Sequence, residues 1–365
     1  MRVGIAGAGA IALGYAAFLS KQGHDACVWS PSGRATSAFV DGIPLKISGC
    51  FQETFPLIVC TDVQDLCKNE VVILALPAYG HRTVIDRIAP YLKASHTVII
   101  SGHLSFSALY LSKKLAERSI EIPIAVWNTT VLTAKLQSPT EVRIGAVRKR
   151  VDMATLPVRL SQNAFATCCE LFGEKFDAKD DLLTIALSNL NPENHMGIAL
   201  CNLTRIERSE TWGQNQNITP AVGRLLEALD VERLEIAAAY GKPVRSIYDH
   251  FNLSFGVAGQ SMHEIADALV QKGSDPMGPR DIQTRYVLED VPFGLVATLY
   301  LAQICGVAAP LHQAGVEILS ACYGRDLAKD NDILPEIRVP DVDLLRSLSA
   351  DGFHSSGVAQ TRRQR

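Results

Sequence analysis

The chain has 365 residues, 47% of them hydrophobic, and a formal net charge of −3 at pH 7, which leaves room for two domains that each bury their own core. The near balance of charge argues against a nucleic acid or an anionic membrane surface as partner, and no apolar run reaches the length needed to span a bilayer. The nine cysteines lack CxxC spacing, so they fit neither a zinc site nor a secreted disulfide framework and favour a reducing cytoplasm without a bound metal.

The first 34 residues carry the most specific local pattern. A β-type run at Arg2–Ala6 opens into a glycine turn at residues 7–12 (GAGAIA), a helical pattern continues to Lys21, and a second β-type run follows at 26–29. Strand, glycine turn, helix and strand form the opening unit of a dinucleotide-binding, Rossmann-type fold. A secretory signal peptide is the alternative, but glycines inside the apolar stretch and a single preceding charge argue against one.

The turn suits the pyrophosphate of a dinucleotide. Gly7 permits the tight turn, and Gly9 lets the backbone approach a pyrophosphate closely. The free N–H groups of Ala10 and Ile11 start the following helix, where its positive dipole end favours an anion. We therefore assign these four residues to cofactor binding.

The end of the second strand bears on the choice of cofactor. A site that prefers NAD usually has Asp or Glu here to bind the ribose hydroxyls, but the first carboxylate after the strand is Asp41. Ser30 and Ser32 offer hydroxyls and Arg34 a cation, a set that suits the 2′-phosphate of NADP. NADP is therefore the preferred cofactor, with NAD and an ordinary solvated loop as the alternatives.

The N-terminal half continues as an alternation of strand and helix. The β-type run at 71–76 is followed by Pro77, at the carboxyl edge of the sheet, where such folds place the nicotinamide. The run at 141–148 is expected to extend the same sheet. Further strands are expected at 57–60, 97–101 and 122–127, and a helix at 157–172. These elements predict an α/β domain with a doubly wound parallel sheet, for dinucleotide binding, at residues 1–180.

The C-terminal half is mainly α-helical. Apolar residues recur with a period near 3.6 in long stretches separated by loops rich in glycine and proline. These stretches cover residues 195–208, 220–240, 261–272, 294–304 and 309–323. We expect a helical substrate domain at 181–350, a flexible tail at 351–365, and an active site in the cleft between the two domains.

One helical stretch opens with a histidine that follows three asparagines (NLNPENH, residues 189–195). Pro192 suits the first turn of a helix, which places His195 near the amino end. His195 and Asn202 are seven residues apart, on a face other than the apolar stripe that contains Met196. That face suits a cleft, although a surface or capping histidine is the more frequent outcome of such spacing.

A second polar cluster lies at residues 284–296 (TRYVLEDVPFGLV). Arg285 and Asp290 come just before an apolar helix whose first turn contains Pro292. By itself, this spacing is better explained by Asp290 as a helix N-cap and Arg285 as a surface ion-pair partner. Together with a nucleotide-binding domain, the cluster acquires a chemical role.

Hydride transfer to a carbonyl or imine requires a proton donor, for which histidine is suited near neutral pH. A carboxylate beside the histidine fixes its tautomer and favours its protonated form, which suits Asp290. A 2-oxo acid requires a bidentate clamp for its carboxylate, which suits Arg285. The set predicts hydride transfer with His195 as the acid.

These segments resemble the octopine/nopaline (opine) dehydrogenase family over nearly the whole chain, and within it the bacterial enzymes that form N-(1-carboxyethyl) amino acids. The most specific stretches are residues 218–240 (ITPAVGRLLEALDVERLEIAAAY) and 284–296, together with the asparagine-flanked His195. The glycine turn at Gly7 and Gly9 also matches, although many dehydrogenases share it.

The resemblance implies an NAD(P)-dependent oxidoreductase that condenses an amino acid with a 2-oxo acid such as pyruvate and reduces the imine. By this resemblance His195 is the acid–base residue, Asp290 its partner and Arg285 the oxo-acid clamp. Thr130 falls where the family contacts substrate, and Asn202 joins the substrate-binding set because it shares the face of His195. This sequence lacks the acidic residue that some NAD-using members have after the second strand.

Two other functions stay open. A ketopantoate reductase or a glycerol-3-phosphate dehydrogenase would rely on a lysine in the inter-domain helix, and residues 187–202 contain none. A non-catalytic, NAD(P)-binding regulator would keep the glycine turn without needing the three polar residues. Helices of the second domain are equally suited to a homodimer interface.

Overall fold

The structure is a computed structural model, and it describes residues Met1–Phe353. Its contacts divide the chain into two units. Unit 1 comprises Met1–Ala186 and the segment that starts at Leu344, and unit 2 comprises Leu187–Asp343. The division therefore falls a few residues after the boundary expected at 180. Of the tail expected at 351–365, the part from 354 onward lies outside the described residues.

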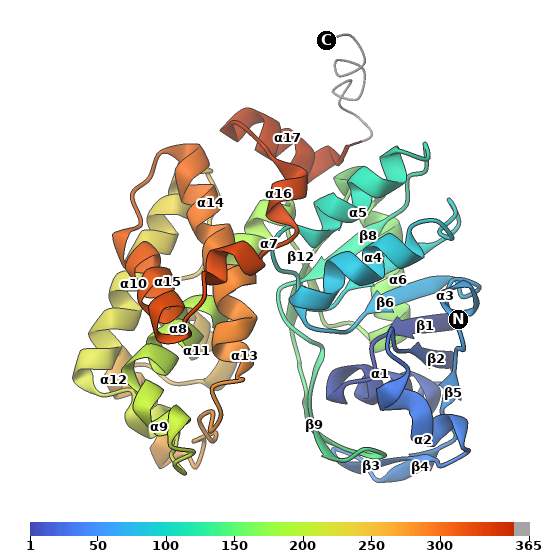
Figure 1. Ribbon diagram of the computed structural model, residues 1–365, viewed down its shortest axis with the longest axis horizontal. Helices are drawn as coiled ribbons and strands as arrows, with labels where there is room; N and C mark the ends of the chain where they lie inside the picture. Colours follow the sequence, from blue (N-terminus) through green and yellow to red (C-terminus); the bar gives the residue numbers. More distant parts are fainter. Residues whose placement is uncertain (354–365) are drawn as a thin grey trace. The chain divides into compact units, whose positions relative to one another are not determined.

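Unit 1 contains an eight-stranded sheet in the order β12-β11-β8-β7-β6-β1-β2-β5 (Figure 1). From β5 to β8 all neighbouring strands are parallel, and their sequence order is the 3-2-1-4-5-6 arrangement typical of dinucleotide-binding domains. Only β11 runs antiparallel to its neighbour β8. The strands are β1 (Arg2–Ala6), β2 (Asp25–Trp29), β5 (Ile58–Val59), β6 (Val71–Leu74), β7 (Thr97–Ile100), β8 (Ile124–Trp127), β11 (Val151–Leu156) and β12 (Phe176–Ala178).

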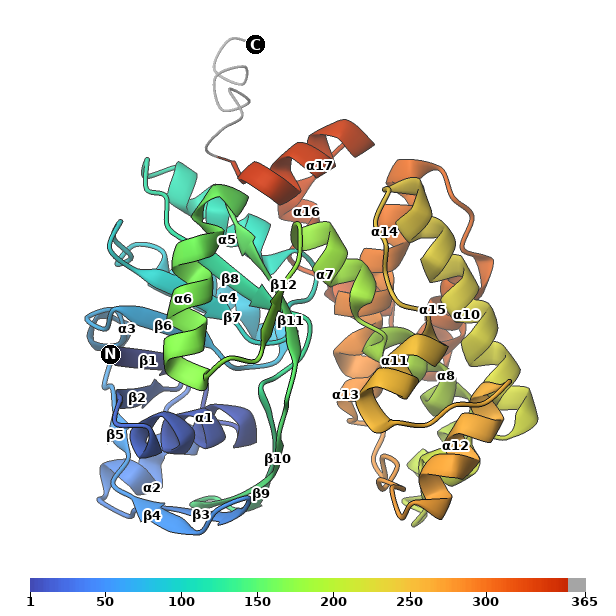
Figure 2. The same ribbon diagram turned by 180° about the vertical axis from the view of Figure 1, so that it is seen from behind.

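Helices cover both faces of this sheet, which confirms the doubly wound prediction. Helices α4 and α5 lie on the face seen in Figure 1, and α1 and α6 on the face seen in Figure 2. The rings of Tyr15 and Phe18 on α1 pack on Phe172 of α6. The helices of unit 1 are α1 (Ala10–Lys21), α2 (Ser37–Val40), α3 (Val63–Leu66), α4 (His81–Ile88), α5 (Ser107–Ala116) and α6 (Ser161–Phe172), with α7 (Leu182–Ser188) at the unit boundary and α17 (Val342–Asp351) near the C-terminus.

A second, four-stranded sheet corrects the prediction for residues 141–148. Strand β10 (Glu141–Val147) pairs with β9 (Leu132–Ser138) and β3 (Leu45–Gly49), and β4 (Glu53–Phe55) completes the sheet. Val142 and Ile144 are fully buried while their neighbours along β10 are partly or fully exposed. Such one-sided burial belongs to an outer sheet with a solvated face, not to the two-sided central sheet.

Unit 2 is helical and has its own apolar core, in which Ile198, Leu226 and Leu319 are almost entirely buried. Its elements are α8 (Asn191–Cys201), α9 (Leu203–Glu207), α10 (Pro220–Ala239), α11 (Ile247–Phe255), α12 (Met262–Gln271), α13 (Arg285–Leu288), the π-helical turn η5 (Val291–Leu295), α14 (Val296–Cys305), α15 (Pro310–Cys322) and α16 (Leu334–Ile337).

The long helix expected at 195–208 is broken. Helix α8 ends at Cys201, Asn202 adopts a non-helical conformation, and α9 begins at Leu203. The Asn202 side chain donates from Nδ2 to the carbonyl oxygen of Ile198 at 3.0 Å. Asparagine side chains that bond nearby backbone groups compete with the helical ladder, which accounts for the break.

The sequence predicts no apolar run long enough to span a bilayer, but the segment Arg285–Cys305 has the length and the mean hydropathy (1.3) of a membrane span. Within its most apolar window, 61% is buried among the other helices. The segment is also not one regular helix, because it comprises α13, η5 and α14. Burial of this extent is typical of a helix in a protein core.

Candidate active site

The glycine turn lies between β1 and α1, as the sequence predicts. Gly7 has a φ of +131°, and a Cβ at this position would lie 2.4 Å from the carbonyl oxygen of Ala75. A side chain at Gly9, in contrast, would meet no atom within 4 Å. The first turn of α1 holds no acidic residue, and the N–H groups of Ala10 and Ile11 have no acceptor inside the helix. The turn therefore fits the pyrophosphate of a dinucleotide.

The end of β2 lies beside this turn, because the N–H of Gly7 donates to the carbonyl oxygen of Trp29 at 2.8 Å. Residues 30–33 form a tight turn, closed by the N–H of Gly33 on the carbonyl oxygen of Ser30. Ser32 and Arg34 are exposed there. The structure adds Arg87, which the sequence did not indicate. Its guanidinium lies 4.6 Å from the centroid of the Trp29 ring. Arg87 lies on α4, far from Trp29 in the sequence, so no motif around it predicts this contact.

Pro77 precedes the short helix η2 (Ala78–Gly80) at the carboxyl end of β6. Two histidines of unit 1 lie in this region of the chain, His81 and His103, and both are buried. Burial lowers the pKa of His81 to about 4 and that of His103 to about 3. Both imidazoles are therefore neutral near pH 7 and poorly suited to donate a proton.

In unit 2, a close approach of η5 and α8 builds the polar centre. A Cβ at Gly294 would lie 2.3 Å from Cγ of Pro192, so only glycine allows this contact. Pro292 has no N–H to donate to the preceding turn, which accounts for the irregular, π-helical path of η5. Because Pro192 is three residues before His195 and η5 begins after Asp290, the contact brings these two side chains together.

His195 and Asp290 form a hydrogen-bonded pair. Nδ1 of His195 lies 2.7 Å from Oδ2 of Asp290, and the two side chains are 14% and 2% exposed. Asp290 is the N-cap residue of η5, but its side chain makes no capping hydrogen bond. Among the described residues, Nε2 of His195 has no hydrogen-bond partner. The pair thus has the form of an acid–base histidine oriented by a carboxylate.

Tyr286 covers one face of the histidine, which the sequence did not predict. The centroids of the His195 and Tyr286 rings are 3.6 Å apart and their planes differ by 8°. The Tyr286 hydroxyl donates to Oε1 of Gln214 at 2.5 Å. A tyrosine within an apolar stretch is usually a core residue, and only the tertiary structure shows its contact with His195.

The three residues assigned to substrate binding differ in environment. The side chain of Arg285 is 61% exposed, with Nε 3.6 Å from Oε2 of Glu289. Arg285 is thus a surface ion-pair partner, as its spacing alone predicts, and its guanidinium is also accessible to a ligand from solvent. Asn202 is buried, and its Nδ2 donates to the carbonyl oxygen of Ile198 in α8, so its place in the substrate-binding set stays a prediction. Thr130, in unit 1, donates from Oγ1 to the carbonyl oxygen of Leu132.

A buried charge cluster holds the first turn of α8. Nε of Arg233 donates to Glu193 at 3.2 Å and to Asp230 at 3.0 Å, and Nδ1 of His312 lies 2.7 Å from Glu232. Burial raises the pKa of Glu193 to about 8, against the attraction of the Arg233 charge. Removing Arg233 would leave the buried Asp230 carboxylate without a counter-charge, so these contacts fix α8 against α10.

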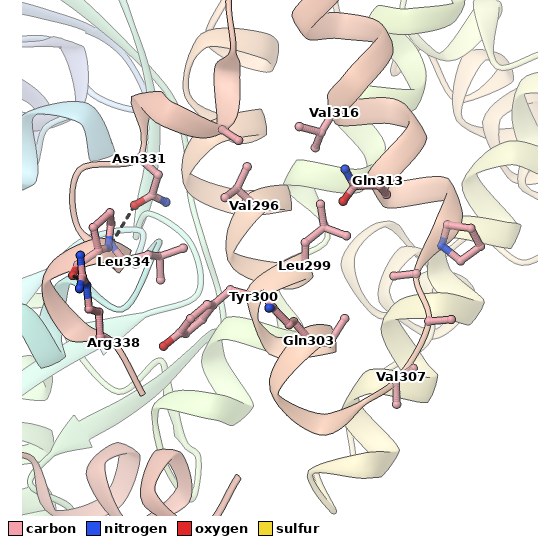
Figure 3. Close-up of a pocket in the computed structure, with 16 residues that line it drawn as sticks. Val296, Leu299, Tyr300, Gln303, Val307, Gln313, Val316, Asn331, Leu334 and Arg338 are labelled. Carbon is pink, nitrogen blue, oxygen red and sulfur yellow. Dashed lines mark hydrogen bonds between the residues drawn. The ribbon is translucent and has the colours of Figure 1, made fainter. Parts of the chain in front are cut away.

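A pocket of about 740 Å³ lies in unit 2 among α14, α15 and α16 (Figure 3). Its walls include apolar side chains such as Val296 and Leu299, and polar ones such as Asn331. The N–H of Leu334 donates to Asn331, the contact drawn as a dashed line in Figure 3. None of the site residues predicted from the sequence lines this pocket.

Two family models match different parts of the chain. Residues 178–323 match the NAD/NADP octopine/nopaline dehydrogenase, alpha-helical domain. Residues 3–103 match the ketopantoate reductase PanE/ApbA model. The first match contains the His195–Asp290 pair, and the second contains the glycine turn.

Individual proteins are similar over almost the full length. An opine dehydrogenase of Arthrobacter sp. (strain 1C) is 26% identical over 94% of this chain and 94% of its own. The fold is that of octopine dehydrogenase solved with NADH and L-arginine (TM-score 0.81, 16% identity, 96% of this chain and 98% of that chain). Yersinopine dehydrogenase with NADP+ bound has a TM-score of 0.70 at 16% identity, over 92% of this chain and 98% of that chain.

Proposed function

We propose that this protein, which belongs to the octopine/nopaline dehydrogenase family, is an NAD(P)H-dependent opine dehydrogenase. An amino acid and a 2-oxo acid such as pyruvate lose water to form an imine. A hydride and a proton then reduce its C=N bond to a secondary-amine dicarboxylate. The observation that carries the proposal is the His195–Asp290 pair, which lies inside the part of the chain that matches the family's helical domain.

The residues of the pair divide the acid–base work between them. Asp290 accepts the hydrogen bond from Nδ1 of His195, which fixes the ring and leaves Nε2 as the atom that gains and loses the transferred proton. Nε2 delivers its proton to the amine nitrogen during reduction and removes one in the reverse direction. The nicotinamide cofactor, when bound at the glycine turn, supplies the hydride.

Arg285 is the proposed clamp for the carboxylate of the oxo acid. Its exposed guanidinium lies five residues before Asp290, and a guanidinium binds a carboxylate with two parallel hydrogen bonds. We expect Arg285→Ala to raise KM for pyruvate by about 10- to 100-fold, since hydrogen bonds to charged groups contribute about 1.5–3 kcal/mol. Steady-state kinetics measure this, and the Kd of NADPH is the control. An unchanged KM for pyruvate would remove Arg285 from the substrate site.

The turn after β2 is the proposed site of the 2′-phosphate of NADP. The hydroxyls of Ser30 and Ser32 and the exposed guanidinium of Arg34 support it, and Arg87 adds a second cation beside Trp29. We expect Arg34→Ala to weaken NADPH binding by about tenfold and NADH binding by less than about twofold, because only NADPH carries the phosphate. Quenching of tryptophan fluorescence measures both Kd values. Equal losses for the two cofactors would contradict the phosphate assignment.

The cellular setting forms part of the proposal. All nine cysteines are free thiols, which supports a cytoplasmic location. A homodimer formed through helices of unit 2 is also part of the proposal; exposed apolar side chains of this unit include Leu311 and Ile318 on α15. Sedimentation of the wild-type protein measures its oligomeric state.

The activity assay follows cofactor oxidation with pyruvate and a panel of L-amino acids. We expect oxidation only when both pyruvate and a suitable amino acid are present. Oxidation with an oxo acid alone would instead assign the protein to the ketoacid reductases, whose model matches only residues 3–103. If the protein binds NADPH or NADH but oxidises neither under any condition, a non-catalytic, NAD(P)-binding regulator would be favoured.

A further inference from the structure

The stacking of Tyr286 on His195 is unusually direct. The ring centroids are 3.6 Å apart and the planes differ by only 8°. A separation of 3.6 Å is itself the contact distance of two carbon layers. The rings therefore overlap face to face with almost no lateral offset.

Two neutral aromatic rings avoid such a sandwich, because both faces carry negative charge density and an offset or edge-on arrangement is more favourable. A cation over a phenol face is attracted instead. The arrangement therefore suits an imidazolium at His195 better than a neutral imidazole. Oδ2 of Asp290 lies 2.7 Å from Nδ1 and accepts the hydrogen bond that the ring donates in this orientation.

Tyr286 is itself held at both ends. Its hydroxyl donates to Gln214, whose own N–H donates to the carbonyl oxygen of Pro276 at 2.8 Å. At the other end, the N–H of Tyr286 donates to Oγ1 of Thr284, the N-cap of α13. Burial raises the pKa of the Tyr286 phenol, so its hydroxyl stays protonated and keeps donating. The ring is thus a fixed surface against which His195 lies.

We propose that Tyr286 is a positioning residue for the reduction: its ring holds the His195 imidazole in the plane that Asp290 requires and stabilises the imidazolium that donates the proton. The proposal deepens the proposed function and rests on it. Tyr286 touches the acid rather than the reacting atoms, so its removal affects proton delivery and leaves substrate binding largely intact.

Substitutions at Tyr286 remove none of the ion pairs that the charged cluster at the first turn of α8 makes. The cluster in the first turn of α8 bonds among its own members and not to His195. A difference in pH dependence between Tyr286 variants therefore reports the ring. The charged and titratable groups on α8, on the elements packed against it and in the link between α13 and η5 are Glu193, His195, Cys201, Arg205, Glu207, Arg224, Glu227, Asp230, Glu232, Arg233, Glu235, Arg285, Tyr286, Glu289, Asp290, His312, Glu317 and Cys322.

The test compares Tyr286→Leu, which removes the aromatic face, with Tyr286→Phe, which keeps the face and loses the bond to Gln214. Tyr323→Leu is the matched control, because the Tyr323 hydroxyl donates to Ile282 in the same unit and its ring is not stacked on His195. Two quantities are measured in each full-length variant. They are the titration of the His195 imidazole by nitrogen-15 NMR, and kcat and KM as a function of pH.

In Tyr286→Leu we expect the titration midpoint of His195 to fall by about 0.5–1 pH unit, as the loss of a cation–π contact implies. The alkaline limb of the kcat profile should move by the same amount, kcat should fall by about tenfold, and KM should stay within about twofold. Tyr286→Phe should restore the wild-type midpoint, and Tyr323→Leu should match the wild type.

An unchanged midpoint in Tyr286→Leu would overturn the proposal, and so would a midpoint in Tyr286→Phe that falls as far as in Tyr286→Leu. Tyr286→Met fills a similar volume without an aromatic face and replaces Tyr286→Leu if that variant does not fold. The NMR titration needs no substrate. A wild-type protein without opine dehydrogenase activity would therefore refute the proposed function while the positioning proposal is still decided by the midpoints.

Discussion

Replacing His195 by alanine is expected to lower kcat by about 100- to 10,000-fold, which is the usual contribution of a positioned general acid. The imine nitrogen must gain a proton as the hydride arrives, and His195 offers a side chain with a free Nε2 held in place by a buried carboxylate. Water is a poorer acid near neutral pH and is not held in position. The Kd of NADPH should stay within about twofold, because the glycine turn lies in the other unit.

A more exposed histidine–carboxylate pair in unit 2 provides the matched control. Nε2 of His263 lies 3.5 Å from Oδ2 of Asp267, and both residues lie on α12 with more exposed side chains. His263→Ala should keep kcat within about twofold of the wild type, as expected for an exposed pair. Stopped-flow and steady-state kinetics of both variants are the measurement. Equal kcat in His195→Ala and wild type would remove His195 from the chemistry.

The second large effect is expected from Asp290→Asn, which should lower kcat by about 100-fold or more at nearly unchanged cofactor affinity. The substitution keeps the shape of the side chain but removes the charge that orients His195. An amide can also donate an N–H to Nδ1, which selects the tautomer with its proton on Nε2. Nδ1 cannot accept this hydrogen bond and carry a proton at the same time, so the imidazolium that donates the proton is disfavoured.

The double variant tests whether the two residues act as a unit. If they do, His195→Ala combined with Asp290→Asn should be hardly slower than His195→Ala alone. Multiplied losses would mean that Asp290 acts independently of His195. Asp267→Asn, on the exposed pair, is the control and should leave kcat within about twofold.

Local patterns made the nucleotide-binding half predictable. The glycine turn at residues 7–12 and the alternation of strands and helices indicated the doubly wound sheet, because both depend on neighbours in sequence. The prediction that β10 extends the central sheet was wrong. Alternating apolar residues show that one face of a strand is buried, but they do not show which strand lies beside it.

The helical half was predictable in extent and less so in detail. The period of 3.6 located the helices, but the break at Asn202 depends on a side-chain bond to Ile198 that periodicity does not report. The contact of His195 with Asp290 came from chemical reasoning and resemblance, since 95 residues separate them. Tyr286, Gln214 and Arg87 were missed because their roles rest on contacts between distant segments.

Formation of a C–N bond between the two substrates is the central claim, and isotope labelling tests it most directly. The wild-type protein is incubated with NADPH, carbon-13-labelled pyruvate and a nitrogen-15-labelled amino acid taken from the active members of the panel, and the products are analysed by mass spectrometry. We predict one secondary-amine dicarboxylate that carries both labels, formed in step with cofactor oxidation and absent in His195→Ala. Labelled lactate without nitrogen-15, formed at the same rate as cofactor oxidation, would contradict the account.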